Sequence, residues 1–381
     1  MTVMQRVVVA HPFPDLYGAD LMLLRSLEAM ARSGWDIVLA VPEDGPMLER
    51  LTGTGISHQV VDFPVLRRGL LAPAALAGLA RDSVVGVNRL RRLLRHLRPD
   101  VVYVNTLTLP HWLLAARAER VPAVCHVREL ESQTSRAVAT GLTAPLLAAH
   151  AVIANSEATR QFLLRHHRRL ARTTNVIYNG YTFPDEAPVP LSPGGRRRLT
   201  LVGRLSVRKG QDVAVRAAAE LLRSGHDVEL ELVGSAFRGY EWYQQELVDL
   251  AAGLGLADRL LLRGFAADVW PFLRAADVIL VPSRVEPFGS VAVEALAAGR
   301  PVVVSDVGGL PEIVRHRHTG LVVPPESPDA LASAVAEMLA DPGTASRWAA
   351  EGSRDVRERF PLARYERELL LTLRAASASR D

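Results

Sequence analysis

The stretch that decides the fold runs from Val278 to Ala295 and reads VILVPSRVEPFGSVAVEA. Its first four residues are all aliphatic, which predicts a strand buried on both faces of a parallel sheet. Two prolines and a glycine follow within residues 282–289 and predict a loop. From Ser290 onward the composition favours a helix, so a strand, a loop and a helix follow one another as in a βαβ unit.

The same alternation continues in both directions along the chain, and six short apolar runs in each half predict strands. The runs of the first half are Val7–Ala10, Asp36–Val41, Val101–Asn105, Pro122–Val127, Ala151–Asn155 and Val176–Tyr178. Those of the second half are Leu199–Val202, Val228–Val233, Leu260–Arg263, Val278–Val281, Val302–Ser305 and Leu321–Val323. Amphipathic segments separate the runs, so we expect an α/β protein with two doubly wound, Rossmann-like domains.

A proline-rich seam separates the two predicted domains. Residues 183–195 contain four prolines and two glycines, which excludes a helix or a central strand. We therefore expect an N-terminal domain over 1–183, a linker over 184–197 and a C-terminal domain over 198–358, with the two domains facing a central cleft. Leucines near helical spacing after Pro361 predict a last helix within 359–381 that docks back on the first domain.

Composition narrows the class of protein. The 381 residues are 49% hydrophobic and 23% charged, which is typical of a soluble globular chain. A single cysteine, Cys125, excludes an intrachain disulfide and a cysteine zinc cluster, and no other metal cluster is evident. The chain enters a strand pattern at once, without a signal-peptide layout, and its longest uncharged run, Ala137–Ser156, contains Gly141 and Pro145. We expect a cytoplasmic protein.

Charge is unevenly distributed between the two halves. Residues up to Phe183 carry a formal charge of +7 and the remainder carry −3. A basic first half favours an anionic partner. Among 45 basic residues only Lys209 is a lysine, and it lies in the loop after the first strand of the second domain.

That loop, Val202–Gly210, contains Gly203, Arg204 and Lys209. It follows a strand and precedes a helix, so it lies at the carboxyl end of the sheet, where open α/β sheets bind ligands. Gly203 allows close approach of the backbone, and the two cations can hold one anion. The alternative is an ordinary basic surface loop.

Two carboxylates flank the start of the helix after Val278–Val281. Glu286 lies in the loop and Glu294 about one turn into the helix, while Gly289 and Ser290 open it. The N–H groups at such a helix start attract anions, and the two acids can bind different hydroxyls of one ligand. The alternative is an acid that favours the helix dipole together with a solvated glutamate.

The spacing of these two acids matches the E-x7-E motif of the retaining glycosyltransferases of family 4. The segment Glu286–Val303 closely resembles that family, and Gly203–Gly210 is similar to its diphosphate-binding loop. Val307–Glu312 and Ile177–Gly180 also resemble family segments. The resemblance covers most of the second domain and implies the GT-B fold, which is two facing Rossmann-like domains.

The resemblance also implies roles for the donor side. Arg204 and Lys209 would hold the diphosphate of a nucleotide-sugar, Glu294 the ribose hydroxyls, and Glu286 the donor sugar. Backbone N–H groups would come from Phe288, Gly289 and Ser290. Phe265 would lie near the base. The resemblance implies no obligatory metal or cofactor beyond the nucleotide-sugar co-substrate.

In the first domain the candidates are Gly18 and His126. Gly18 lies between the first strand and the first helix and could approach a phosphate, although a plain tight turn explains it equally. Family members often have two glycines and a glutamate there, whereas this chain has Tyr17-Gly18 and Asp20. His126 ends a strand where family members often place a histidine close to the transferred sugar, and a hydrogen-bonded structural histidine is the alternative. Arg128 and Glu129 are further candidates. Asn105 and His111 are candidates too, although a structural role is the simpler interpretation for both.

We therefore expect a retaining hexosyltransferase that uses a nucleoside-diphosphate sugar, with a UDP-hexose favoured. The acceptor would be a sugar, a lipid-linked sugar or a small molecule, as in polysaccharide biosynthesis. Two alternatives stay open: a nucleotide-sugar epimerase on the same fold, and a non-catalytic glycosyltransferase-like binding protein. The E-x7-E context opposes the first, and the four intact charged residues Arg204, Lys209, Glu286 and Glu294 oppose the second.

Three basic segments raise the question of peripheral contact with an anionic membrane on its inner face. Arg89–Arg98 is an amphipathic helix, and Arg165–Arg169 and Val65–Leu71 add charge and leucines. The simpler interpretation of the first is a Rossmann helix that packs leucines on its sheet. Nucleic acid is not expected, because the basic runs lack interleaved aromatic residues.

Overall fold

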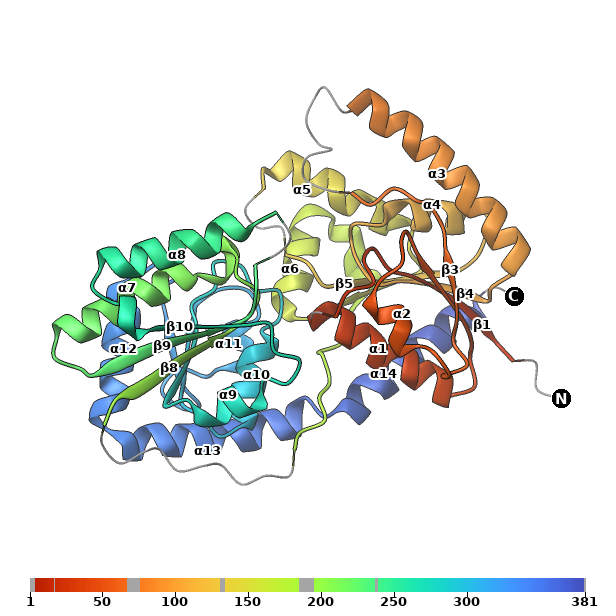
Figure 1. The fold of residues 1–381 in the computed structure, drawn as a ribbon. Helices are drawn as coiled ribbons and strands as arrows, with labels where there is room; N and C mark the ends of the chain where they lie inside the picture. Colours follow the sequence, from red (N-terminus) through yellow and green to blue (C-terminus); the bar gives the residue numbers. More distant parts are fainter. Residues whose placement is uncertain are drawn as a thin grey trace. The chain divides into compact units, whose positions relative to one another are not determined.

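The chain divides into two compact units, residues 1–180 with 362–381 and residues 181–361 (Figure 1). The computed structural model describes residues 4–16, 18–66, 76–130, 134–184, 195–236 and 239–379, without the side chains of residues 76–82. Most of the predicted linker, residues 185–194, lies outside these ranges.

The first unit is built on a parallel sheet with the strand order β3-β2-β1-β4-β5-β6-β7. Its strands are β1 (Arg6–Ala10), β2 (Asp36–Val41), β3 (Ser57–Val60), β4 (Val101–Val104), β5 (Ala123–Val127), β6 (Ala151–Ala154) and β7 (Thr174–Val176). Its helices are α1 (Gly18–Arg32), α2 (Pro46–Arg50), α3 (Leu76–Leu97), α4 (Pro110–Ala118), α5 (Arg136–Thr143), α6 (Glu157–His166) and α14 (Leu362–Ala378).

Two strand predictions for this unit were wrong. The described sheet has a further edge strand, β3, whose sequence SHQV is mostly exposed and has no apolar run to reveal it. The last strand was placed at Val176–Tyr178, two residues late, because Thr174 and Asn175 pair with β6 although they are polar.

The second unit has a parallel sheet in the order β10-β9-β8-β11-β12-β13. Its strands are β8 (Arg197–Val202), β9 (Val228–Val233), β10 (Leu260–Gly264), β11 (Val278–Val281), β12 (Val302–Ser305) and β13 (Leu321–Val323), and they confirm the six predicted runs. Its helices are α7 (Gln211–Arg223), α8 (Glu241–Gly253), α9 (Trp270–Ala275), α10 (Ser290–Ala297), α11 (Leu310–Ile313), α12 (Pro328–Ala340) and α13 (Pro342–Arg359).

Both sheets have a doubly wound order, so the predicted two-domain α/β fold is confirmed. The strand order reverses between β1 and β4 in the first sheet and between β8 and β11 in the second. Ligands of open α/β sheets bind outside the carboxyl ends of the strands at such a reversal. The loops after these four strands are therefore where a functional site is expected.

The last helix, α14, belongs to the core of the first unit. Tyr365, Leu369 and Leu373 are at most 1% exposed and pack in the same apolar cluster as Leu23 and Leu27 of α1. The residues that follow the second unit in sequence thus complete the core of the first.

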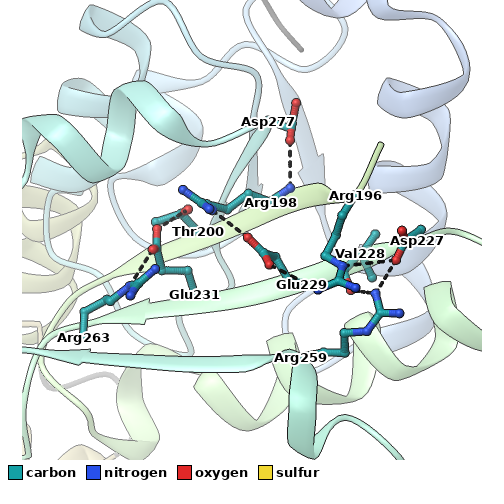
Figure 2. A network of polar contacts seen from close by, with 10 residues as sticks. All are labelled: Arg196, Arg198, Thr200, Asp227, Val228, Glu229, Glu231, Arg259, Arg263 and Asp277. Carbon is teal, nitrogen blue, oxygen red and sulfur yellow. Dashed lines mark hydrogen bonds and ion pairs between the residues drawn. The ribbon is translucent and has the colours of Figure 1, made fainter. Parts of the chain in front are cut away.

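One face of the second sheet is polar at its edge, as Figure 2 shows. On β9, Val228, Leu230 and Leu232 point into the core, while Glu229 and Glu231 point to the opposite face. Glu229 accepts a hydrogen bond from Arg198 of β8 at 2.8 Å, and Glu231 accepts hydrogen bonds from the side chains of Thr200 at 3.1 Å and Arg263 at 2.8 Å. This cross-strand ladder of opposite charges is a sheet-stabilising pattern. Coverage of both faces by apolar packing, expected from the sequence, does not extend to these strands.

The basic helix α3 uses its leucines for packing. Leu90, Leu94 and Leu97 are at most 7% exposed, and Arg91 and Arg95 pair with Glu119. The burial of these leucines agrees with the simpler interpretation of this segment. No helix in the described ranges combines the length and the apolar character needed to cross a membrane.

Candidate functional site

The loops after β8 and β11 touch each other at a glycine. The loop after β8 turns through Gly203, at φ 152°, and ends at Gly210, at φ 70°, which begins α7. A Cβ added at Gly210 would collide with the carbonyl group of Pro282 in the loop after β11. Both the backbone conformation and the close approach therefore require glycine there.

Lys209 and Glu286 join these two loops. Lys209 Nζ donates a hydrogen bond to Glu286 Oε2 at 2.6 Å, and the side chains are 29% and 10% exposed. Ser283 Oγ contacts the same oxygen at 3.3 Å. A Cβ added at Gly203 would lie 3.8 Å from the Lys209 side chain, so the backbone there passes close to the ammonium stem. The result is a half-buried ion pair at the point where the sheet order reverses.

Arg284 holds the loops together from the other side. It donates to both carboxylate oxygens of Asp212 in the first turn of α7, at 2.8 and 2.7 Å, and to the Val207 carbonyl at 2.7 Å. Burial alone would raise the pKa of Asp212, but the Arg284 hydrogen bonds outweigh it and the pKa is lowered. The same bonds raise the pKa of Arg284. A bidentate pair of this kind fixes geometry as well as charge.

The start of α10 is held in place by close packing. Gly289 has φ 117°, and a Cβ added to it would lie 2.7 Å from Leu310 Cδ2. The backbone N–H of Gly309, in the loop after β12, donates to the Glu286 carbonyl at 3.0 Å. Tyr181 donates to the Ser290 hydroxyl at 2.7 Å, and its ring stacks with that of Phe288. These contacts fix the position of the first turn of α10.

The structure thus brings Gly203, Lys209, Glu286 and Gly289 together, as expected for one site. Arg204 lies half-buried in the same loop as Lys209, and Glu294 lies half-buried within α10. Phe265 follows β10 and is 53% exposed. A fixed ammonium, a second basic side chain and a helix start can bind an anion, while the two carboxylates can accept hydrogen bonds from hydroxyls.

The two candidates of the first domain lie in the first unit. His126 is in β5 and is fully buried. Gly18 is the first residue of α1, and a Cβ added there would meet nothing within 4 Å, so packing does not require glycine. In the described ranges no group of three or more His, Cys, Asp or Glu residues is placed to hold a metal ion.

Sequence reasoning missed the role of Arg284 and the ion pair itself. Arg284 stands inside the quoted stretch, next to Glu286, and an acid in the first turn of α7 was the only signal for its partner. The pairing of Lys209 with Glu286 joins residues 77 positions apart, and no local pattern encodes it.

Two family models match consecutive parts of the chain. Residues 18–182 match the model described as Glycosyltransferase Family 4. Residues 183–355 match the model described as Glycosyl transferases group 1.

Individual relatives agree with these families. A D-inositol 3-phosphate glycosyltransferase of Rhodococcus jostii is 30% identical over 375 residues, which cover 89% of this chain and 80% of the relative. An uncharacterized glycosyltransferase of Methanocaldococcus jannaschii is 37% identical over 201 residues, and that match spans only half of the relative's length. The Anabaena protein HepE, solved in complex with UDP, superposes with a TM-score of 0.78 at 25% identity over 98% of this chain and 100% of HepE.

Proposed function

Because the chain belongs to the family 4 glycosyltransferases of the GT-B fold, we propose that it transfers a hexose from a nucleoside-diphosphate sugar to an acceptor hydroxyl with retention of configuration. The donor is a UDP-hexose. The acceptor is a sugar, a lipid-linked sugar or a small molecule. The proposed reaction needs the nucleotide-sugar as co-substrate and requires no further cofactor.

The observation that carries the proposal is the Lys209–Glu286 pair beside the start of α10. Departure of a nucleoside diphosphate places growing negative charge on its phosphate. Lys209, Arg204 and the N-terminal end of α10 supply fixed positive charge for that group. Removing one such donor costs roughly 3 kcal/mol of transition-state stabilisation in comparable electrostatic sites.

The two glutamates have binding roles in this proposal. Glu286 accepts a hydrogen bond from Lys209 at 2.6 Å, so it orients the ammonium and offers its remaining lone pairs to the donor sugar. Glu294 binds the ribose hydroxyls. They are not the acid and nucleophile of a glycosidase, and the leaving phosphate itself takes the acceptor proton.

The comparisons support the choice of donor and acceptor class. HepE was crystallised with UDP and with UDP-glucose, which favours a uridine nucleotide here. The name of the Rhodococcus relative contains D-inositol 3-phosphate, which favours a small polyhydroxylated acceptor here.

The test is acceptor-dependent turnover of labelled UDP-hexoses by the full chain. We expect release of UDP only with acceptor, a product whose anomeric configuration equals that of the donor, and loss of turnover in Lys209→Met. Arg354→Ala, which changes an exposed arginine of α13, is the matched control. Inversion in the product would exclude retention, and an epimerised free nucleotide-sugar would replace the transferase proposal with the epimerase.

We further propose that the protein acts in the cytoplasm and contacts an anionic membrane through the first unit. Four arginines at the end of α6 and just after it, Arg165, Arg168, Arg169 and Arg172, form no ion pair with any residue that the structure describes. Unpaired cations near a surface are each worth about 1 kcal/mol on an anionic leaflet. Unlike Arg89, Arg91 and Arg95 of α3, which pair with Asp62 and Glu119, these four arginines are available to lipid.

Vesicle sedimentation tests this contact. We expect binding to phosphatidylglycerol vesicles that falls with salt and is lost in an R168E/R169E variant. The control R347E/R354E makes the same charge change on α13 of the second unit. Equal binding to neutral phosphatidylcholine vesicles, or equal binding by R168E/R169E, would contradict the proposal.

A further inference from the structure

A chain of buried hydrogen bonds runs along the carboxyl ends of β1, β4 and β5. Asp20 Oδ1 lies 3.0 Å from His11 Nε2, and His11 Nδ1 lies 3.3 Å from Asn105 Nδ2. Asn105 Oδ1 accepts from Arg128 Nε at 2.9 Å. These four residues are at most 8% exposed, so each hydrogen bond must have a defined donor.

Arg128 is the centre of the chain. Its guanidinium donates to Asn105 Oδ1 and Asn179 Oδ1 at 2.9 Å, to Tyr365 Oη at 3.1 Å and to His126 Nδ1 at 3.2 Å. A guanidinium has only donors and stays charged, so every one of these partners must accept.

This constraint propagates away from Arg128. Because Asn105 presents its oxygen to Arg128, its amide nitrogen faces His11 and donates to Nδ1. His11 therefore carries its proton on Nε2 and donates it to Asp20. Because Arg128 cannot accept a hydrogen bond, it sets the donor and the acceptor of every hydrogen bond in this series.

For His126 the consequence is a fixed tautomer. Nδ1 accepts from Arg128 at 3.2 Å, while the one proton of the Tyr103 hydroxyl is directed either to the same nitrogen, 2.8 Å away, or to Asn105 Oδ1, 3.3 Å away. The ring proton is then on Nε2, which is buried and has no hydrogen-bond partner within the described part of the chain. Burial, reinforced by the Arg128 cation, holds the pKa of His126 well below its ordinary range, so the ring is neutral.

The last helix supports this arrangement through Tyr365. Since its oxygen accepts from Arg128, its own proton goes to Ser26 Oγ, 2.6 Å away on α1. Ser26 in turn donates to the Met22 carbonyl at 2.8 Å. Tyr365 thus connects Arg128 to the backbone of α1, although it comes from the far end of the chain.

We infer that Arg128 fixes His126 as the Nε2–H tautomer, so that His126 serves bound substrate as a hydrogen-bond donor and not as a proton acceptor, and that Tyr365 holds Arg128 in place. Arg128 and Tyr365 are positioning residues. The contact of His126 with a substrate oxygen, a sugar hydroxyl or a phosphate oxygen, rests on the proposed transfer reaction. The tautomer itself is independent of that reaction.

The direct test is long-range ¹H–¹⁵N NMR of the full chain labelled at histidine nitrogens, with the His126 signals assigned by their loss in His126→Gln. We expect a protonated Nε2 and an unprotonated Nδ1 that persist from pH 8 to pH 5. A protonated Nδ1, or conversion to imidazolium in that range, would overturn the inference whether or not any transfer activity is found.

A pair of variants tests the role of Arg128. Lysine is also only a donor, whereas glutamine can both donate and accept, so Arg128→Lys preserves the constraint and Arg128→Gln removes it. We expect kcat to fall roughly tenfold more in Arg128→Gln than in Arg128→Lys, with the KM for donor changed less, as for loss of one hydrogen bond to a charged group. Equal losses in both variants would contradict a tautomer role.

Substitutions of His126 distinguish a role as hydrogen-bond donor from a role as general base. The amide nitrogen of His126→Gln can take the place of Nε2, whereas that of His126→Asn lies near Nδ1. We expect His126→Gln to retain at least tenfold more kcat than His126→Asn, and Tyr365→Phe to lower kcat without changing its pH profile. An acid limb in the wild-type kcat profile that disappears in His126→Gln would assign a base and contradict the donor role.

Discussion

Lys209 Nζ and Glu286 Oε2 lie 2.6 Å apart and join the loops after the two central strands of the second sheet. Among the described residues Glu286 is the only hydrogen-bond partner of this ammonium, which has three donors. Two donors are therefore left for a ligand, while the carboxylate keeps the charge in position. The pair explains how one lysine can be both fixed and available.

The first prediction concerns the coupling within this pair. Lys209→Met leaves the Glu286 carboxylate, 10% exposed, without its counter-charge, and should lower the free energy of unfolding by about 1–2 kcal/mol. Glu286→Gln should cost a similar amount. The double variant should cost less than the sum, because it removes both charges. Urea unfolding of the four proteins measures this, and strict additivity would show that the pair does not interact energetically.

The second prediction concerns the clamp made by Arg284. Arg284→Ala leaves Asp212 without its bidentate partner and should destabilise the second unit by about 2–3 kcal/mol. It should also weaken nucleotide binding, because the loop that carries Lys209 loses its support. Arg317→Ala removes an exposed bidentate pair with Glu337 and serves as the control, with an expected cost below about 1 kcal/mol. Equal effects of the two variants on nucleotide affinity would remove Arg284 from the account.

The third prediction concerns the start of α10. Gly289→Ala places a methyl group 2.7 Å from Leu310 Cδ2 at φ 117°, and should cost about 1–3 kcal/mol. Gly253→Ala at the end of α8 meets nothing within 4 Å and should be neutral or slightly stabilising. Thermal unfolding compares them. A stable Gly289→Ala variant with normal activity would show that the helix start can shift.

The fourth prediction concerns pH. The unfolded chain protonates His126 near pH 6.5, whereas burial keeps its folded pKa well below that value. Below pH 6.5 the unfolded state therefore binds more protons, and stability falls by about 1.4 kcal/mol per pH unit until the folded pKa is reached. Above pH 6.5 His126 is neutral in both states, so its contribution to the pH dependence of stability vanishes. The His126→Gln variant has no such pH-dependent contribution. The difference in unfolding free energy between wild type and variant should therefore narrow or reverse between pH 6.5 and pH 5. A constant difference would contradict burial of a neutral ring.

The sequence was sufficient to predict the strands that consist of apolar runs. Val278–Val281 and Val228–Val233 were predicted with their observed bounds, because burial of a parallel strand leaves a local signature. The polar edge strand Ser57–Val60 was missed, because its pairing with β2 depends on position in the sheet and not on composition.

The candidate sites divide in the same way. The sequence predicted that Gly203, Lys209, Glu286 and Gly289 lie in neighbouring loops, because a loop at the end of a parallel strand is a local feature with a known geometric consequence. The contacts of Arg284 with Asp212 and of Arg128 with Tyr365 were not found. They join residues 72 and 237 positions apart, and only the folded chain brings these side chains together.

The most direct test of the central claim is thermal unfolding of the wild type and of Lys209→Met with UDP, GDP, dTDP or ADP. A ligand at 100 times its Kd adds about 2.7 kcal/mol to the folded state, which corresponds to a shift of several degrees. We predict that UDP alone raises the Tm of the wild type by that amount and leaves Lys209→Met almost unchanged. A shift of equal size in both proteins, or no shift of the wild type with any nucleotide, would contradict a diphosphate site at Lys209.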